Sequence, residues 1–307
     1  MAYTGATVPE TGTTSAATLT RDVYLDTLAA YNRSLIFAQY VYKQTITGGT
    51  GGQFIVEGKE DTTDGSIATY TSGAQVDVTN GTQDERIINV DRPVYVARRI
   101  DRFKEMTARY DVIKMQLNQI GANLAAKQDR KLSAAIEAAS LATGRAGNGN
   151  GVVVVNTALP GGVAQPATPG GLGDEIIESV FAAVAAIRLN DDTSDVYVAI
   201  NPVNYSYLVQ SGRATNADYT NGNGGLDTGM VMRIGGATIL QTNHLPTTAG
   251  LIGLAFSSQA VGMVELWDID TKISEQEDFL GAKLITGSLC NGVGVLRPNC
   301  AVSIKNI

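Results

Sequence analysis

The chain has 307 residues, of which 44% are hydrophobic and 17% charged, so it is long enough to bury one large core or two smaller ones. A formal net charge of −7 argues against a dedicated nucleic-acid-binding protein, which normally carries an excess of lysine and arginine. The sequence has no apolar run near the roughly 18–20 residues of a membrane span, and no signal-peptide pattern, so we expect a soluble protein made in a reducing cytoplasm.

The first hundred residues predict segments that are not stable by themselves. Residues 1–20 are small and polar, which predicts a flexible arm that a partner would order. An imperfect amphipathic helix with an extended end is expected over 21–43. After the glycine run at 48–52, strand candidates at 53–60 and 86–100 enclose a polar stretch and predict a long β-hairpin. Because a two-stranded ribbon of this length is unstable alone in water, it needs another surface to lie on.

A long helix and a mixed α/β body are expected next. Apolar residues recur at three- and four-residue steps over 106–142, which predicts a helix of roughly 50 Å. A second helix is expected over 174–189, with Asp174 and Glu175 favourably placed at its N-terminus, and another begins near Pro202. The rest predicts short strands, beginning with 152–155 and 195–200 and continuing with the segments ATILQTN, LIGLAF, AVGMVELWDI, KLITGSL, VGVLR and AVSIK.

Five short motifs, set in this order of elements, carry a family resemblance. They are QFIVEGK from Gln53, RYDV from Arg109, QIGANLA from Gln119, YVAINP from Tyr197 and VLRPNCAV from Val295. With the order arm, hairpin, long helix and α/β body, the chain resembles the major capsid proteins of tailed bacteriophages of the podovirus type, which have the Hong Kong 97-like fold. The resemblance spans most of the chain.

The resemblance implies an α+β fold in which the long helix is the spine. Extended hairpins of this family, called E-loops, lie across neighbouring subunits, and axial domains cluster around five- and six-fold axes. The implied parts are the N-terminal arm at 1–47, the E-loop at 48–98, the peripheral domain with the spine helix at 99–143 and 257–294, and the axial domain at 144–256 and 295–307.

The implied function is that of a shell subunit and not of an enzyme. Copies would self-assemble as pentamers and hexamers into an icosahedral head that encloses double-stranded DNA without sequence-specific binding. The virion is the implied location, and scaffolding, portal and decoration proteins are potential partners. Two alternatives stay open: an encapsulin-like compartment shell, which gene neighbours would distinguish, and a hydrolase or sugar-binding module, which the near absence of histidine disfavours.

A basic cluster at the junction of hairpin and long helix has two interpretations. It is either a solvated helix entry with Asp101 and Glu105 as local partners, or a surface that pairs with the acidic hairpin of a neighbouring subunit. Arginine suits the second role because its planar fork binds a carboxylate through two hydrogen bonds. Lys59 matches no isopeptide cross-link site known in one branch of the family. The candidate contact residues are Arg98, Arg99, Arg102, Arg109, Glu57, Lys59, Glu60, Asp61 and Asp64.

Signals of catalysis or of a bound cofactor are weak. His244 is the sole histidine, which excludes a multi-histidine metal site, and we interpret it as a loop residue hydrogen-bonded to a neighbour. The glycine runs fail as nucleotide-binding motifs, since Glu60 stands where Ser or Thr would bind magnesium and GNGNG follows a helix. The acidic run from Glu57 lacks calcium-loop spacing. Cys290 and Cys300 are expected to be reduced and buried. We therefore expect no catalytic residue, cofactor or metal.

Overall fold

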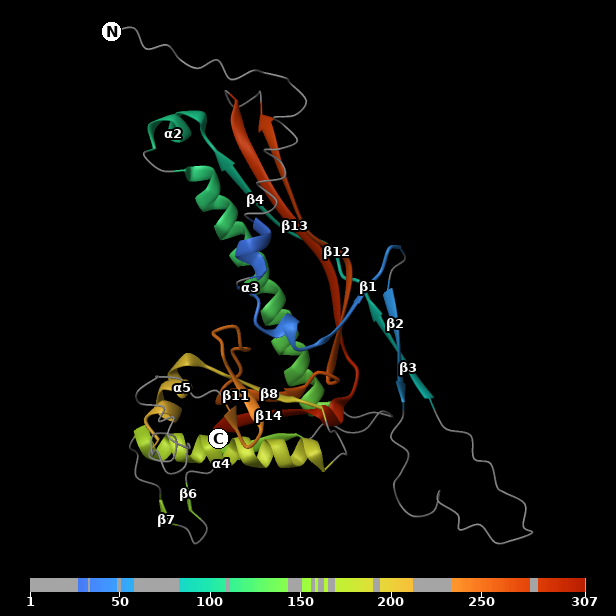
Figure 1. The fold of residues 1–307 in the computed structure, drawn as a ribbon, viewed down its shortest axis with the longest axis vertical. Helices are drawn as coiled ribbons and strands as arrows, with labels where there is room; N and C mark the ends of the chain where they lie inside the picture. Colours follow the sequence, from blue (N-terminus) through green and yellow to red (C-terminus); the bar gives the residue numbers. More distant parts are fainter. Residues whose placement is uncertain are drawn as a thin grey trace, which may run out of the picture. The chain divides into compact units, whose positions relative to one another are not determined.

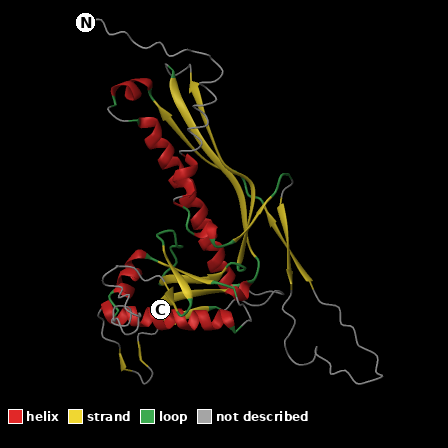
Figure 2. Cartoon of the chain, in the orientation of Figure 1, coloured by secondary structure: helices red, strands yellow, loops and turns green. Residues whose placement is uncertain are grey.

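The computed structural model describes about two thirds of the chain, as an α+β fold (Figures 1 and 2). None of the helices in this part combines the length and the apolar character that a membrane crossing requires. The flexible arm expected at 1–20 and the hairpin tip at 58–82 lie outside the described residues, whereas the implied N-terminal arm at 1–47 is described from residue 27, except for residue 33. The described residues are 27–32, 34–48, 51–57, 83–108, 111–142, 151–155, 158–159, 163–164, 169–189, 194–211, 233–276 and 281–306.

The described residues belong to two compact units. Unit 1 draws on Met1–Leu35, Asp91–Gln128 and Trp267–Asn291, and unit 2 on Ile36–Val90, Asp129–Leu266 and Gly292–Ile307. Three elements contribute residues to both units, namely helix α3 (Val112–Leu141) and strands β12 (Val261–Gln276) and β13 (Ala282–Val295).

Unit 1 contains the first part of helix α3 and part of a four-stranded sheet. The sheet has the strand order β1-β12-β13-β4, in which β4 (Val94–Ile100) belongs to unit 1, whereas β1 (Tyr42–Thr45) and the start of β12 with which it pairs belong to unit 2. Strands β4 and β13 are antiparallel, and alternate residues of each strand pack on the helix. A Cβ atom at Gly287 would lie 2.5 Å from Cγ2 of Ile120, so glycine lets the helix approach the sheet closely. The buried cluster is Tyr31, Ile100, Val112, Leu117, Ile120, Leu124, Ala125, Ile269, Ile285 and Leu289.

Unit 2 is built around a six-stranded sheet with apolar side chains on both faces. On β8, Val198 and Ile200 pack with helix α4 (Pro169–Arg188), whereas Ala199 packs with Phe37 and Leu132 on the opposite face. A strand buried on both faces reads as a continuous apolar run, as YVAI does here. The strand order is β5 (Val152–Val155), β14 (Ala301–Asn306), β11 (Leu251–Ser257), β8 (Val196–Ile200), β10 (Ala237–Gln241) and β9 (Arg233–Ile234). The remaining small elements are β6 (Ala158–Leu159), β7 (Val163–Ala164), helix α5 (Pro202–Val209), and the one-turn helices η1 (Phe37–Gln39) and η3 (Pro298–Cys300).

The predicted hairpin is present at its base, but its returning strand is shorter than predicted. Strands β2 (Gly51–Glu57) and β3 (Gln83–Asn89) pair antiparallel. Pairing ends at Asn89, and β4 then joins the sheet of unit 1. The interruption contains Pro93, which has no N–H to donate to a strand ladder.

A seat lined with glycine holds the hairpin base in unit 2. Ile88 is 4% exposed and packs with Val264 and Leu296. Cβ atoms at Gly262 and Gly294 would lie 3.0 and 2.8 Å from the Ile88 side chain, so larger residues there would displace it. We call Ile88 and these two glycines the hairpin seat.

The helices predicted at 106–142 and 174–189 differ from the prediction in their bounds. The first is divided into α2 (Arg102–Thr107) and α3, because Ala108 has an extended backbone and the Asp111 side chain then accepts from the N–H of Lys114 at 3.0 Å as a new N-cap. The second begins earlier, at Pro169, so Asp174 and Glu175 are not in its first turn. Proline is tolerated at a helix start. Glycine is needed at 173, where a Cβ would lie 2.2 Å from the Tyr207 carbonyl oxygen of α5.

Candidate functional site

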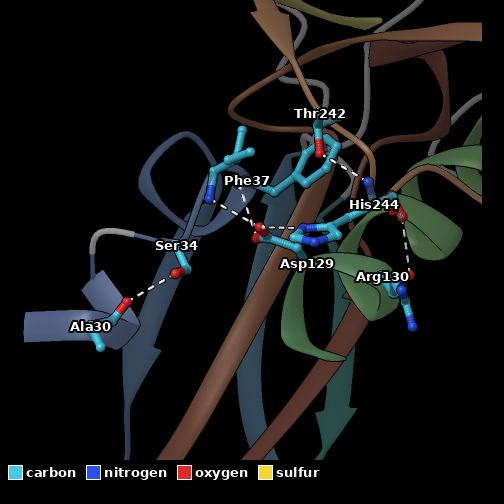
Figure 3. Close-up of polar contacts among 9 residues, drawn as sticks. Ala30, Ser34, Phe37, Asp129, Arg130, Thr242 and His244 are labelled. Carbon is cyan, nitrogen blue, oxygen red and sulfur yellow. Dashed lines mark hydrogen bonds and ion pairs between the residues drawn. The ribbon is translucent and has the colours of Figure 1, made fainter. Parts of the chain in front are cut away.

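A buried carboxylate on helix α3 fixes the chain at the start of η1 (Figure 3). Asp129 is fully buried, and its Oδ2 and Oδ1 accept hydrogen bonds from the backbone N–H groups of Ile36 at 3.0 Å and Phe37 at 3.1 Å. The Phe37 ring is also fully buried and lies 5.8 Å from the ring of Phe256. The carboxylate thus satisfies donors of a one-turn helix that has no side-chain cap of its own.

His244 completes this group from the loop after β10. Its Nδ1 lies 3.3 Å from Oδ2 of Asp129, and its ring is 22% exposed. The His244 N–H donates to Oγ1 of Thr242 at 3.1 Å (Figure 3). The His244 carbonyl accepts from Oγ of Ser133 at 2.7 Å. The interpretation of His244 as a hydrogen-bonded loop residue is confirmed. We call Asp129, His244 and the Ile36–Phe37 backbone the spine clamp.

The electrostatics of the spine clamp match a structural role. Burial raises the pKa of Asp129 above its ordinary value, and the hydrogen bonds from Ile36, Phe37 and His244 offset only part of this effect. In the part of the chain that is described, no three histidine, cysteine, aspartate or glutamate side chains converge as a metal site. The hydrogen bonds of the clamp tie together helix α3, the start of η1 and the loop that holds His244.

Glu175 on helix α4 is a second buried acid, and no described residue satisfies it. The residue is 4% exposed, and both carboxylate oxygens are buried without a hydrogen-bond partner among the described residues. Burial raises its pKa, and the nearby charge of Glu178 raises it further.

Replacing Glu175 by glutamine is therefore expected to stabilise the protein by about 1 kcal/mol or more above neutral pH. An acid whose pKa is raised by folding destabilises the folded state once the pH exceeds the unfolded value, and fully so above the folded value. The gain should vanish below the unfolded pKa, where the acid is neutral in both states. Thermal unfolding of E175Q and wild type at acidic and alkaline pH measures this. A gain that is equal at both pH values would show that desolvation of the charge is not the cause.

The basic cluster of the sequence lies partly on strand β4 and partly on helix α2. Arg98, Arg99 and Arg102 are all exposed. The two acids expected as their local partners have other contacts: the Asp101 side chain accepts from the N–H of Phe103, and Glu105 pairs with Lys283 at 2.7 Å. The contact role of the three arginines stays a prediction.

Of the remaining candidate contact residues, Glu57 alone is among the described residues. Glu57 ends β2, where it pairs with Gln83, and the other five lie outside the described residues: Arg109, Lys59, Glu60, Asp61 and Asp64.

Two exposed apolar side chains near the basic cluster were not predicted from the sequence. Phe103 and Met106 of α2 are 74% and 76% exposed and lie three residues apart, on one side of the helix. Apolar residues in a short segment give no sign of exposure in the sequence. The cysteine prediction is confirmed: both thiols are buried and neither is in a disulfide, and Cys290 donates to the carbonyl of Asp91 at 3.4 Å.

Comparison with known proteins shows which family this chain is similar to. A family model described as phage capsid protein matches residues 95–303, which is more than half of the chain. The capsid of the cyanophage P-SCSP1u is 27% identical over 89% of this chain and 88% of that one, with a TM-score of 0.71. The mature capsid of bacteriophage PhiM1 is 15% identical, with a TM-score of 0.63 and coverage of 89% and 87%.

Another similar structure is the virus-like particle from Pyrococcus furiosus, at 13% identity, a TM-score of 0.55 and coverage of 94% and 99%. This likeness and that to PhiM1 show the fold alone. A search of curated protein sequences found no significant match. The predicted Hong Kong 97-like fold is confirmed, and so is the role of a major capsid subunit. The chain belongs to the phage capsid protein family.

Proposed function

We propose that this major capsid protein assembles in the host cytoplasm, as pentamers and hexamers, into an icosahedral head that encloses packaged double-stranded DNA. The observation that carries the proposal is the family match over residues 95–303, which includes the spine helix and both long strands of the sheets. The role proposed is purely structural, with no reaction catalysed and no cofactor held.

The hairpin supports assembly because its strands need a further surface. Strands β2 and β3 form a two-stranded sheet of their own. Ribbons of two strands are marginal in water. Ile88 is buried in the hairpin seat, whereas the adjacent Ile87 is 66% exposed. We propose that a neighbouring subunit covers the exposed side of the hairpin.

The arginines on β4 and α2 support a charged contact at the same interface. Arg98, Arg99 and Arg102 are exposed, and the hairpin sequence is acidic through Glu57, Glu60, Asp61 and Asp64. We propose that these arginines of one subunit bind hairpin carboxylates of the next. Exposed ion pairs are weak singly, at about 0–1 kcal/mol, but a shell repeats each contact in every copy.

A compartment shell with protein cargo is the second candidate. The virus-like particle from Pyrococcus furiosus shares the fold at 13% identity, which shows the fold alone, whereas the cyanophage capsid is 27% identical. The contents of the purified particles distinguish the two: duplex DNA supports the phage head, whereas a single enriched host protein supports the compartment.

Negative-stain electron microscopy of the purified protein, expressed alone and with its genomic neighbours, tests the proposal. We expect closed shells or capsomer rings tens of nanometres across. A monodisperse monomer under both conditions would contradict assembly.

A further inference from the structure

Strand β4 ends the four-stranded sheet and has one open edge. It pairs with β13 on one side in a single register from Val94 to Ile100, and no strand in the described part of the chain pairs with its other edge. The backbone N–H and C=O groups along such an edge can pair with a strand of another chain. Proteins usually prevent this with a proline, a bulge, a very short strand or charge. Of these, β4 has charge alone, from Arg98 and Arg99, which favours an acidic strand and disfavours a basic one.

The hairpin offers strands of the same length that also have open edges. Strands β2 and β3 have 7 residues each and pair with each other in a single register, and neither has a second partner among the described strands. One end of β3 lies against its own chain, since Ile88 packs in the hairpin seat and a Cβ atom at Gly292 would lie 2.1 Å from the carbonyl oxygen of Asn89. Residues Gln83–Ile87 are therefore the part of β3 that can pair with a further strand.

The charges of β3 and β4 match in an antiparallel alignment. When this part of β3 is set antiparallel to the last five residues of β4, Asp84 comes opposite Arg99. Glu85 then comes opposite Arg98, whereas Arg86, the single cation of β3, comes opposite an alanine. Opposite charges that face each other directly across two strands are favourable, and like charges are unfavourable. The alignment thus has two favourable charge pairs and no unfavourable one.

Strand β2 fits this edge less well. Its one acid, Glu57, is the last residue of the strand, so an antiparallel alignment sets it opposite Val94, at the uncharged end of β4. The two arginines then come opposite uncharged residues. Exposure favours β3 as well, because Ile87 is 66% exposed and comes opposite Val96 as an apolar pair. Charge and exposure therefore both select β3 as the strand that pairs with β4.

We propose that β3 of one copy adds to the open edge of β4 in the next copy, as an antiparallel strand that extends the sheet across the boundary between subunits. The inference rests on the proposed function, because it names the contact that the hairpin makes in the shell. The partner is a second copy, since the chain is a capsid subunit, which assembles with copies of itself. In strand addition the backbone hydrogen bonds supply the affinity, and the side chains fix the register.

The contact gives each copy two different roles. One copy donates its β3 and accepts a strand on its β4, so the contact joins unlike surfaces. Contacts between unlike surfaces form rings when the rotation between the copies closes. The pentamers and hexamers of the proposed head are rings of this kind, so a single strand pairing, repeated in every copy, links a whole ring.

Cysteine pairs test the register in assembled shells. In E85C/R98C the new cysteines of neighbouring copies come directly opposite each other, with Cβ atoms about 4.5–5.5 Å apart, which is close to the separation in a disulfide. We expect mild oxidation to give linked dimers and larger oligomers on a non-reducing gel. R98C alone should give none, because both natural cysteines are buried.

Two further pairs are the matched controls. In D84C/R98C the cysteines would lie on opposite faces of the extended sheet, so they should not link. Q53C/R98C reports pairing with β2 instead of β3. Cross-links from either control and not from E85C/R98C would overturn the proposal, and so would shells of E85C/R98C that do not link.

Hydrogen exchange gives a second measurement on the unaltered protein. We expect amides of β4 to exchange several-fold more slowly in shells than in free subunits, because the added strand pairs with the open edge. Strand β8, which pairs with strands on both sides within one chain, is the reference and should exchange alike in both states. Unchanged exchange in β4 would overturn the inference even if E85C/R98C forms no shells. Failure of the proposed function would look different, since the wild type itself would then form no shells.

Discussion

Replacing Asp129 by alanine is expected to lower the free energy of unfolding by about 3–5 kcal/mol. The change removes the acceptor of the Ile36 and Phe37 N–H groups, and it removes the partner of His244. Each buried donor left unpaired costs about 1–3 kcal/mol. Urea unfolding of the purified protein, followed by far-ultraviolet circular dichroism, measures the loss.

Two related variants separate the parts of the spine clamp. Asp129→Asn keeps one carbonyl acceptor and nearly the same volume, so its loss should be smaller than that of D129A. His244→Ala should cost less again, about 1 kcal/mol, because the ring is partly exposed and Asp129 keeps both backbone donors. If D129A unfolds at the same urea concentration as D270A, a change at an exposed acid, then the clamp does not stabilise the fold.

Reversing the charge of Arg99 is expected to reduce shell assembly about tenfold or more while the subunit stays folded. Arg99 is exposed on β4, so glutamate fits there without a burial penalty. A contact that is attractive by about 1 kcal/mol becomes repulsive in every copy, and the cost multiplies around the capsomer. Shell yield in sedimentation and electron microscopy is the measurement, with circular dichroism to verify folding.

The control for R99E is K272E, the same reversal at an exposed lysine of β12, which should assemble like wild type. A charge exchange makes the test specific: R99E combined with E60R should regain shells if Arg99 meets this part of a neighbouring hairpin. The other hairpin acids are tested in turn. Normal shells from R99E alone would refute the contact.

Local sequence patterns predicted most of the core and little of the clamp. The apolar runs of β5, β8 and β11 and the three- and four-residue steps of α3 are local signals, and the structure has these elements where they were expected. By contrast, the bonds of Asp129 join residues 92, 93 and 115 positions apart, and no local pattern encodes such a pairing. His244 could be interpreted correctly because a sole histidine leaves few alternatives.

The helix boundaries show a second limit of prediction from sequence. Pro169 and the glycines that follow it resemble a loop in sequence, yet they begin α4. Glycine is required at 173 because the backbone of α5 lies too close for any larger residue there. Proximity of this kind exists only in the folded chain. The contacts of the arginines are also not predictable from the sequence of one chain, since their proposed partners belong to another copy.

The hairpin seat has a mechanical consequence. Ile88 is held there by apolar contacts, among two glycines, Val264 and Leu296, and dispersion contacts have no preferred direction. The Ile88 side chain can therefore tilt without breaking a hydrogen bond of its own. In the proposed icosahedral shell one sequence must fit positions of unequal curvature, and we expect this apolar joint at the root of the hairpin to let each copy adjust the direction of its hairpin.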